Sequence, residues 1–372
     1  MEDTQLAQNR LSTMALNAET HGDLEKAAML YRQAIDLDPA NPLPYLFFGH
    51  ALLLGGNETA ATEVWSLGSD IDPRLTQTWR SEAAAPEVRQ RSHAADITLR
   101  RVLTQQHHDF IESQRAVSSA DSLDVIADAI WCQTHDTAFE YRDPEQRPHL
   151  MLVPSLQPIP VYSKDQLPWL TKLEAAASLI RDEYLAAREA AQDQQAPYVE
   201  AHMAALGDEW QPLANSMNWG SLHLYKRGKE NPALTALFPE TLQILEQLPL
   251  VRTPTGPSEV LFSVLEAGQR IPPHYGVSNT DVTVHLPIVT VDDAAIKVRE
   301  ESFPWQDGTA FAFDDAYLHE SWNHSDEPRV NLLFEAWHPD LNAEEQAALT
   351  AAIATRANWN AARSLDHGLT DT

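Results

Sequence analysis

The chain has 372 residues, long enough for two or three domains, and its 43% hydrophobic content is ordinary for a globular protein with a sizeable core. Lys and Arg number 26 against 54 Asp and Glu, and the resulting net charge of −28 repels phosphate backbones, so we expect no nucleic-acid partner. One cysteine, Cys132, excludes an internal disulfide and fits a reducing compartment. The N-terminal residues carry no basic and apolar leader, and no apolar run reaches the roughly 18 residues that span a bilayer, so we expect a cytoplasmic protein with no membrane partner.

Residues 1–75 contain an internal repeat with a period of 34 residues. The matching pairs are Gly22 with Gly56, Ala27 with Ala61, Tyr31 with Trp65, Ala34 with Gly68, and Asp38-Pro39 with Asp72-Pro73. This pattern resembles the tetratricopeptide repeat, in which small residues let helices approach closely and a proline ends the second helix. Two repeats are fewer than the three usually needed for a stable stack, so residues 76–147 are expected to add helices that pack on them. The repeats either dock a peptide of a protein partner or only pack against other structure.

Composition changes between residues 136 and 165, where several prolines replace helix formers, and we place the start of a second domain at residue 148. Residues 165–194 then predict an amphipathic helix. Its expected apolar face holds Leu170, Leu173, Ala176, Leu179 and Ile180.

Two shorter elements are expected before the main strands. Residues 218–231 predict a strand with Leu222 and Leu224 on one face, because alternate side chains of a strand share a face. Residues 236–250 predict a short helix that begins near Pro239. We expect both to belong to the scaffold around the strands that follow.

Between Ser258 and Pro339, short apolar alternations are broken by Gly, Pro, Asn and Asp, which predicts β-strands joined by turns. Alternation puts Ser263 on an apolar face with Leu261 and Leu265, where a buried hydroxyl needs a hydrogen-bond partner. That partner is either the backbone of the chain or a polar ligand.

Residues 281–288 predict another strand of this region. Alternation puts Asp281, Thr283, His285 and Pro287 on one face, opposite a face of Val, Leu and Ile that belongs to a core. On an isolated strand we expect the polar face to meet solvent, whereas in a binding site it would point inward.

Two histidines and an arginine stand at strand ends in the same region. His274 follows two prolines, and His319 follows a predicted strand and an Asp-Asp turn. Asp314 and Asp315 are typical turn residues, or they orient a ligand imidazole. Arg329 opens the last strand ten residues after His319, either as a solvated charge or as a fork that clamps a carboxylate.

Together these motifs resemble the aspartyl/asparaginyl β-hydroxylases, which are Fe(II)- and 2-oxoglutarate-dependent oxygenases. The resemblance rests on FSVLEAGQRIPPHYG at 262–276, FDDAYLHESWN at 313–323 and the closing WHP at 337–339, and it runs from about residue 148 to 345. It implies a double-stranded β-helix of the jelly-roll or cupin-like type that uses Fe(II), 2-oxoglutarate and O₂.

The resemblance also implies a role for each matching residue. His274 and His319 match the two iron ligands and form the catalytic set together with Arg329. Ser263, His285 and Arg329 match the residues that hold 2-oxoglutarate, with Arg329 on its distal carboxylate. Neutral imidazoles suit Fe(II), and two of them leave coordination positions for 2-oxoglutarate and O₂.

Three positions depart from related patterns. Gly276 stands where most 2-oxoglutarate oxygenases carry a carboxylate ligand, which this family also generally lacks. Thr283 and Asp281 stand where arginines are often found near the cosubstrate and the substrate. The chain therefore lacks two cations that would meet an acidic target.

We predict an α+β chain with tetratricopeptide-like repeats in 1–75, additional helices in 76–147, a double-stranded β-helix with flanking helices in 148–345, and a C-terminal helix and tail in 346–372. The predicted function is hydroxylation of an unactivated carbon, foremost the β-carbon of an Asp or Asn residue in a protein or peptide. The alternatives are hydroxylation of a small molecule, a repeat-based adaptor with a catalytically silent barrel, and a cupin-like barrel that binds iron without 2-oxoglutarate.

Overall fold

The computed structural model describes residues 2–116, 120–136, 139–201 and 207–367. Their contacts divide the chain into two compact units. The first comprises Met1–Ala116, Thr134–Ala138 and Ala351–Thr372, and the second comprises Val117–Gln133 and Phe139–Thr350. None of the described helices combines the length and the apolar character that crossing a membrane requires. The chain is thus α+β, with N-terminal helices followed by antiparallel sheets, as predicted.

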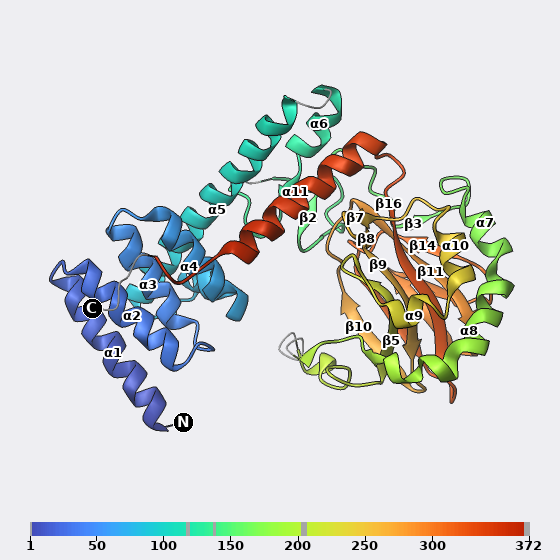
Figure 1. Ribbon diagram of the computed structural model, residues 1–372, viewed down its shortest axis with the longest axis horizontal. Helices are drawn as coiled ribbons and strands as arrows, with labels where there is room; N and C mark the ends of the chain where they lie inside the picture. The colour runs from blue at the N-terminus through green and yellow to red at the C-terminus, as the bar shows by residue number, and fades with distance from the viewer. Residues whose placement is uncertain (1, 117–119, 137–138, 202–206, 368–372) are drawn as a thin grey trace. The chain divides into compact units, whose positions relative to one another are not determined.

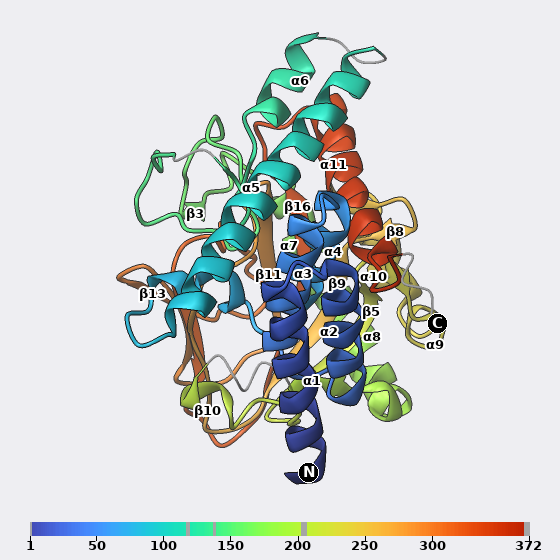
Figure 2. The same ribbon diagram turned by 90° about the vertical axis from the view of Figure 1, so that its left-hand side faces the viewer.

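The first unit is helical, and its first helices contact one another in sequence order (Figure 2). They are α1 (Glu2–Thr20), α2 (Leu24–Leu37), α3 (Leu43–Leu54), α4 (Glu58–Ile71), the 3-10 turn η1 (Leu75–Arg80) and α5 (Pro86–Arg115). Close packing depends on small residues: a Cβ at Gly49 would lie 2.4 Å from the indole nitrogen of Trp65. That indole N–H donates to the carbonyl of Leu46 at 3.0 Å, so Trp65 fixes α4 against α3.

The repeated residues occupy equivalent places in two helix pairs. Gly22 and Gly56 each follow a helix with φ of 80° and 81°, a left-handed conformation that glycine adopts without strain. Asp23 and Asn57 then cap α2 and α4 with side-chain oxygens that accept a backbone N–H of the first turn. The sequence period therefore marks a repeat of helix pairs, and its assignment to the tetratricopeptide family stays a prediction.

Prolines mark the limits of these helices. Helices α2 and α4 end immediately before Asp38-Pro39 and Asp72-Pro73, as expected. Helix α5 begins at Pro86, where proline has no N–H to leave unpaired. Helix α6 (Ala120–Ala127) follows, and the domain limits expected from the sequence stay a prediction.

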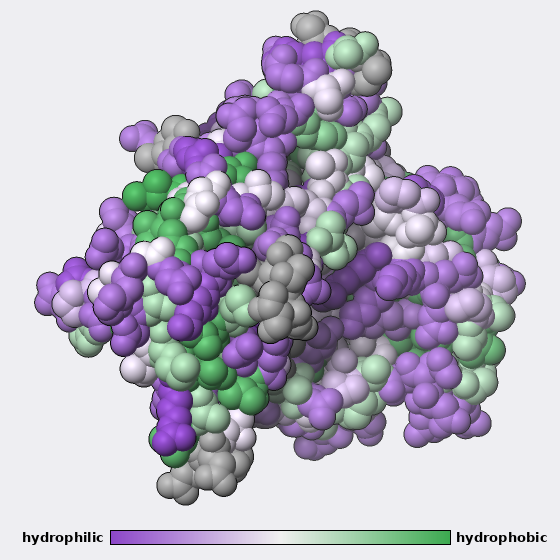
Figure 3. Space-filling view, turned by 60° about the vertical axis from the view of Figure 1, so that its left-hand side comes forward, coloured by the Kyte–Doolittle hydropathy of each residue, from purple (hydrophilic) through white to green (hydrophobic). Residues whose placement is uncertain are grey.

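Apolar side chains also reach the surface of the helical unit. Figure 3 shows apolar areas among the hydrophilic side chains. The exposed apolar residues of α1 to α4 include Leu6, Met14, Leu37, Leu43 and Leu54. Docking of a peptide on this unit stays a prediction.

The second unit is built around two antiparallel sheets (Figure 1). The larger sheet has the strand order β3-β14-β11-β16-β9-β5-β4, with β6 also paired to β5, and the smaller has the order β10-β15-β12-β13. The larger comprises β3 (Val161–Tyr162), β4 (Ala196–Pro197), β5 (Trp219–Lys226), β6 (Lys229–Glu230), β9 (Glu259–Leu265), β11 (Asp281–Val289), β14 (Phe311–Phe313) and β16 (Arg329–Trp337). The smaller comprises β10 (Gln269–His274), β12 (Ala294–Val298), β13 (Glu301–Pro304) and β15 (His319–Asn323). Short pairs are formed by β1 (Ile130–Trp131) with β2 (Met151–Leu152), and by β7 (Arg252–Thr253) with β8 (Gly256–Pro257).

Helices cover one face of the larger sheet (Figure 1). They are α7 (Leu170–Ala175), α8 (Ala177–Ala191), α9 (Pro232–Thr235) and α10 (Pro239–Leu245). The ring of Tyr184 in α8 lies 5.0 Å from that of Phe262 in β9, and both belong to the main hydrophobic core with Val282 and Val284 of β11. Because side chains alternate along a strand, residues between these core positions point to the opposite face of the sheet.

The helix expected at 165–194 forms, but it is divided at Ala176 into α7 and α8. Leu170, Leu173 and Ile180 are buried as expected, whereas Leu179 is 40% exposed, so its placement on the apolar face was wrong. Burial continues from Leu173 through Ala177, Ile180, Tyr184 and Ala187, a spacing of three and four residues that excludes position 179. The strand with Leu222 and Leu224 on one buried face and the helix starting at Pro239 are confirmed.

The last helix, α11 (Ala343–Ala362), follows the closing strand β16. The side-chain oxygen of Asn342 accepts the N–H groups of Glu344 and Glu345, which caps the start of this helix. The expected C-terminal helix therefore forms, and the end of the expected tail, residues 368–372, lies outside the described residues.

Candidate active site

The residues singled out from the sequence meet between the two sheets. Ser263 of β9, His285 of β11 and Arg329 of β16 lie on the face of the larger sheet opposite the helices, because their sequence neighbours fill the helix-covered core. The ring of Phe313 on the larger sheet lies 5.0 Å from that of His319 on the smaller sheet. We call this face of the larger sheet the inner face.

His274 and His319 are register partners at the end of β10 and the start of β15, and their ring centroids lie 4.1 Å apart. The Nδ1 atoms lie 2.7 Å from the carbonyl of Pro272 and 2.9 Å from the carbonyl of Tyr317, respectively. A carbonyl only accepts, so each Nδ1 carries the proton and each Nε2 keeps the lone pair that binds metals. Burial lowers the pKa of both rings, and the neighbouring His274 lowers that of His319 further, so both rings are neutral at neutral pH.

A carboxylate lies beside the histidine pair although position 276 has no side chain. A Cβ at Gly276 would lie 1.8 Å from Oδ1 of Asp315, so the Asp315 side chain fills the space that a residue at 276 would need. Its Oδ2 accepts the hydroxyl of Thr283 at 3.1 Å, its Oδ1 is buried without a partner, and burial raises its pKa. Among the described residues, no group of three or more His, Cys, Asp and Glu side chains is arranged to hold a metal, so Asp315 adjoins the pair without completing a triad.

Arg329 is a buried cation, with only 1% of its surface exposed. Its Nη1 donates to the carbonyl and the hydroxyl of Ser263 at 3.4 and 3.3 Å, and its Nε is buried without a partner. The guanidinium carbon lies 5.7 Å from the centre of the Trp305 ring, and burial lowers the pKa to about 9. No ion pair joins it to a described residue, so Arg329 is a charged group without a counter-ion and the solvated-charge alternative is wrong.

Ser263 supports this arginine from the neighbouring strand. Its hydroxyl oxygen accepts from Arg329 and also from the indole N–H of Trp219 at 3.0 Å. The hydroxyl therefore finds its partners in two side chains, rather than in the backbone.

His285 lies next to Arg329 on the inner face. Its ring stacks on Trp305 with centroids 5.1 Å apart, and Nδ2 of Asn331 donates to its Nδ1 at 3.3 Å. Burial and the charge of Arg329 lower the pKa of His285 to about 3, so the ring is neutral. The Oδ1 of Asn331 is buried and has no hydrogen-bond partner. Together with Nε of Arg329, it is the second unpaired polar atom close to His285.

The other end of the inner face is acidic. Asp281 and Thr283 of β11 are 8% and 7% exposed, so the expectation that this polar face meets solvent was wrong, since the strand faces the space between the sheets. Thr283 pairs in register with Glu335 of β16. Burial raises the pKa of Asp281, and repulsion from Glu335 and Asp315 raises it further. Burial, together with Glu259 and Asp315, raises the pKa of Glu335 in the same way.

The sequence analysis assigned no role in the site to Trp219, Trp305, Asn331 and Glu335. Alternation offered a signal for three of them. Trp219 lies opposite the core face of Leu222 in the 218–231 strand, and Asn331 and Glu335 share the face of Arg329. Trp305 follows β13 in an irregular segment, where no period marks an inward side chain.

The family model described as aspartyl/asparaginyl beta-hydroxylase matches residues 174–339. This region of the chain belongs to the aspartyl/asparaginyl β-hydroxylase family. We call residues 174–339 the hydroxylase-family region. It contains every residue that the sequence predicted for the site: Ser263, His274, His285, His319 and Arg329. The roles of these residues stay predictions.

Relatives of the hydroxylase-family region carry different substrate names. Human aspartyl/asparaginyl beta-hydroxylase is 27% identical over 180 residues, which are 48% of this chain and 22% of that protein. An ornithine lipid ester-linked acyl 2-hydroxylase of Rhizobium tropici is 27% identical over 183 residues, which are 48% of this chain and 61% of that protein. Human aspartate beta-hydroxylase domain-containing protein 2 is 28% identical over 212 residues, which are 55% of this chain and 54% of that protein. The match spans less than two thirds of each relative, and family membership alone does not name the substrate.

The solved structure of AviO1 from Streptomyces viridochromogenes Tue57 aligns at 15% identity with a TM-score of 0.25, covering 50% of this chain and 89% of that chain. This similarity is too low to support a statement on function.

Proposed function

We propose that the hydroxylase-family region is an Fe(II)- and 2-oxoglutarate-dependent oxygenase. The observation that carries the proposal is the buried guanidinium of Arg329, which lacks a counter-ion among the described residues and shares the inner space with the paired His274 and His319. A buried, unpaired charge is unfavourable, and a bound carboxylate relieves it. 2-Oxoglutarate carries a carboxylate at each end, so one end can pair with Arg329 while the other binds the metal.

The donor set fits Fe(II). His274 and His319 would hold the ion through Nε2, since both Nδ1 atoms are committed to carbonyls. Both imidazoles are neutral at neutral pH, as metal binding requires. Two protein ligands leave positions for the cosubstrate and O₂.

When bound, iron with 2-oxoglutarate and O₂ supplies the oxidation of C–H to C–OH, and 2-oxoglutarate becomes succinate and CO₂. The chain itself contributes binding, orientation and exclusion of water. Arg329 and Ser263 would hold the distal carboxylate, and the neutral His285 would leave the anion to pair with Arg329. The rings of Trp305 and Phe313, both buried, would shield this space from water.

The architecture forms part of the proposal. Two facing antiparallel sheets with a helix-covered outer face support a double-stranded β-helix, and the repeated helix pairs support a tetratricopeptide-like arm. A cytoplasmic location with a protein partner on the arm remains a prediction from composition and charge.

Two substrate classes follow from different observations. The names of the human relatives favour an Asp or Asn residue of a protein. The buried Asp281 and the partly exposed Glu335 and Asp315 favour a substrate without an acidic group at that end, because a further carboxylate would add repulsion to groups whose pKa is already raised.

The experiment that tests the proposed function is succinate release from 2-oxoglutarate by the iron-loaded chain. Succinate release, with or without an added substrate, supports an oxygenase, whereas an adaptor with a silent barrel releases none. Succinate release is then compared among peptides that contain Asp, the same peptides with Asn in place of Asp, basic peptides, and small molecules. The variant Asp281→Arg, which restores a cation, should raise turnover with acidic peptides if the carboxylates exclude them.

A further inference from the structure

A segment outside the family match contacts both loops that carry the histidine pair. This segment, residues 143–151, ends at the start of β2. The backbone N–H of His149 donates to the carbonyl of Gly276 at 3.0 Å, on the loop after the first histidine. The backbone N–H of Arg147 donates to the carbonyl of Ala316 at 2.7 Å, on the turn before the second histidine. One short stretch therefore links the two loops from outside.

Gln146 is the buried side chain of this segment, with 3% of its surface exposed. Its Nε2 donates to Oδ2 of the fully buried Asp314 at 2.5 Å. The Oδ1 of Asp314 accepts the N–H of Ala316 at 2.9 Å, and its carbonyl accepts the N–H of Tyr317 at 3.2 Å. Asp314 thus closes the turn of residues 314–317, and Gln146 holds Asp314 in place.

The same turn sets the position of both histidine loops. The carbonyl of Tyr317 is the acceptor for Nδ1 of His319, and the carbonyl of Asp315 accepts the N–H of Gly276 at 2.6 Å. We propose that Gln146 is a positioning residue, which orients the His319 imidazole for metal binding by fixing this turn. Outer partners of this kind set the orientation and tautomer of a metal-binding imidazole.

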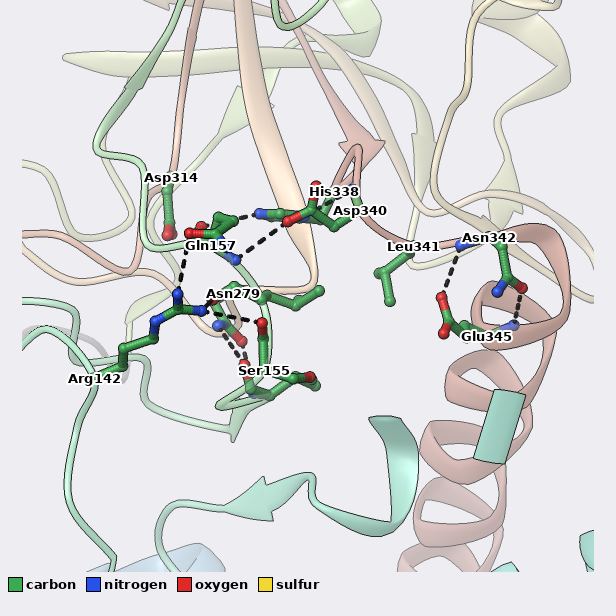
Figure 4. A network of polar contacts seen from close by, with 12 residues as sticks. Arg142, Ser155, Gln157, Asn279, Asp314, His338, Asp340, Leu341, Asn342 and Glu345 are labelled. Atoms are coloured by element: carbon green, nitrogen blue, oxygen red, sulfur yellow. Dashed lines mark hydrogen bonds and ion pairs between the residues drawn. The ribbon is translucent and has the colours of Figure 1, made fainter. Parts of the chain in front are cut away.

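The segment is anchored again beyond β2, as Figure 4 shows. The N–H of Val153 donates to Oδ1 of Asn279 at 2.8 Å, and Nδ2 of Asn279 donates back to the carbonyl of Val153 at 3.0 Å. Arg142 donates to the carbonyl of Ser155 and to Oε1 of Gln157, both at 3.2 Å. These contacts hold both ends of the segment, so Gln146 acts from a fixed base.

The first test replaces Gln146 by a side chain of similar shape that cannot donate. Gln146→Met should weaken binding of Mn(II) in the presence of 2-oxoglutarate by about 10-fold or more, the range that outer partners of metal ligands give. The matched control is Gln8→Met, because Gln8 is also buried and donates to the carbonyls of Ala34 and Asp38, but lies in the helical unit. The control should bind Mn(II) as the unmodified chain does, even if both variants lower the melting temperature.

The second test exchanges donor and acceptor. Gln146→Glu places two carboxyl groups opposite one another. Asp314→Asn leaves one side-chain oxygen for two donors, Gln146 and the N–H of Ala316, so each variant should weaken Mn(II) binding. The double variant restores a hydrogen bond with reversed direction, and the amide oxygen introduced at position 314 would still accept the N–H of Ala316, so affinity should return to within about threefold. If Gln146 only stabilised the fold, the double variant would recover the melting temperature, and metal affinity would not change in any of the three variants.

The role of Gln146 rests on the proposed metal site, but different results would refute the role and the site. An unmodified chain that binds no metal with 2-oxoglutarate overturns the proposed function. An unmodified chain that binds metal while Gln146→Met binds it equally well, or while the double variant binds no better than the single variants, overturns only the role of Gln146. Far-ultraviolet circular dichroism identifies a variant that does not fold, in which case the double variant decides.

Discussion

The two ends of the inner face carry charged groups of opposite sign. The cost of holding these charges away from water is relieved in a different way at each end. At one end the guanidinium of Arg329 has no counter-ion among the described residues. At the other end, burial raises the pKa values of Asp281, Asp315 and Glu335, and repulsion from neighbouring carboxylates raises those of Asp281 and Glu335 further. A carboxylate can take up a proton near neutral pH, whereas a guanidinium cannot lose one there. We therefore expect the arginine end to bind an external anion, whereas the acidic end needs no ligand to neutralise its charge.

This difference gives the site a direction. We propose that a diacid is held by one carboxylate at the arginine end and that an acidic substrate group is disfavoured at the other. The histidine pair lies on the smaller sheet, with His319 against Phe313, whose strand position pairs with Thr283 of the acidic end. Substitutions at the histidine pair, at the arginine end and at the acidic end should have successively smaller effects.

Loss of a metal ligand should have the largest effect. His319→Ala leaves one imidazole where we propose two, so succinate release should fall by more than about 100-fold, beyond the loss that an outer partner gives. His324→Ala is the control, because His324 is exposed and lies on the same segment, 3.6 Å from Asp293 through Nδ1. Succinate release that survives in His319→Ala would refute the proposed metal site.

Removal of the buried cation should separate ligand binding from stability. Arg329→Met should weaken 2-oxoglutarate binding by about 2–5 kcal/mol, as loss of one member of a buried charge pair does. The ligand-free protein should keep or gain unfolding free energy, because an unpaired buried charge is removed. Calorimetric titration and urea unfolding measure the two quantities. Unchanged affinity would show that the anion binds elsewhere.

A smaller effect is expected at the hydroxyl that supports the arginine. Ser263→Ala leaves the N–H of Trp219 without its acceptor and removes one of the two acceptors of Arg329, so 2-oxoglutarate affinity should fall by about 1–2 kcal/mol. Ser221→Ala is the matched control, because Ser221 is the register partner of Ser263 on β5 and donates to the carbonyl of Ala196. Equal losses in both variants would point to a general weakening of the sheet.

The smallest effect is expected at the acidic end and depends on pH. Since burial raises the pKa of Glu335 in the folded state, the folded state keeps a proton that the unfolded state releases, so this contribution is complete at low pH and is lost as pH rises through the raised pKa. Glu335→Gln does not titrate, so it should match the unmodified chain near pH 4 and exceed its unfolding free energy by about 1 kcal/mol near pH 8. Urea unfolding at both pH values measures this. A difference independent of pH would contradict the assigned burial of charge.

Local patterns predicted much of the fold. Period and turn residues placed the strands around Ser263 and Arg329, and the Asp-Pro pairs of the 34-residue period placed the ends of two helices, since each depends on a few neighbouring residues. The roles of His274 and His319 came from a resemblance, because spacing along the chain does not show that two strands pair.

One error arose within a single helix, and the others arose where a distant element decides the outcome. Leu179 was placed on the apolar face, although the buried spacing passes through Ile180. The polar face of β11 was expected in solvent on an isolated strand, because one strand does not reveal the sheet opposite it. The bond between Gln146 and Asp314 joins residues 168 positions apart, which no local pattern predicts.

Coupling between metal and cosubstrate tests most directly whether one diacid joins the histidine pair to Arg329. Fe(II) is titrated into the protein without oxygen, with and without 2-oxoglutarate, and the dissociation constant is compared with that of Arg329→Met. We expect iron to bind at least about tenfold more tightly with 2-oxoglutarate, and this gain to disappear in the variant, because coupling between two ligands of one site is reciprocal. Equal iron affinity with and without 2-oxoglutarate would contradict a shared site.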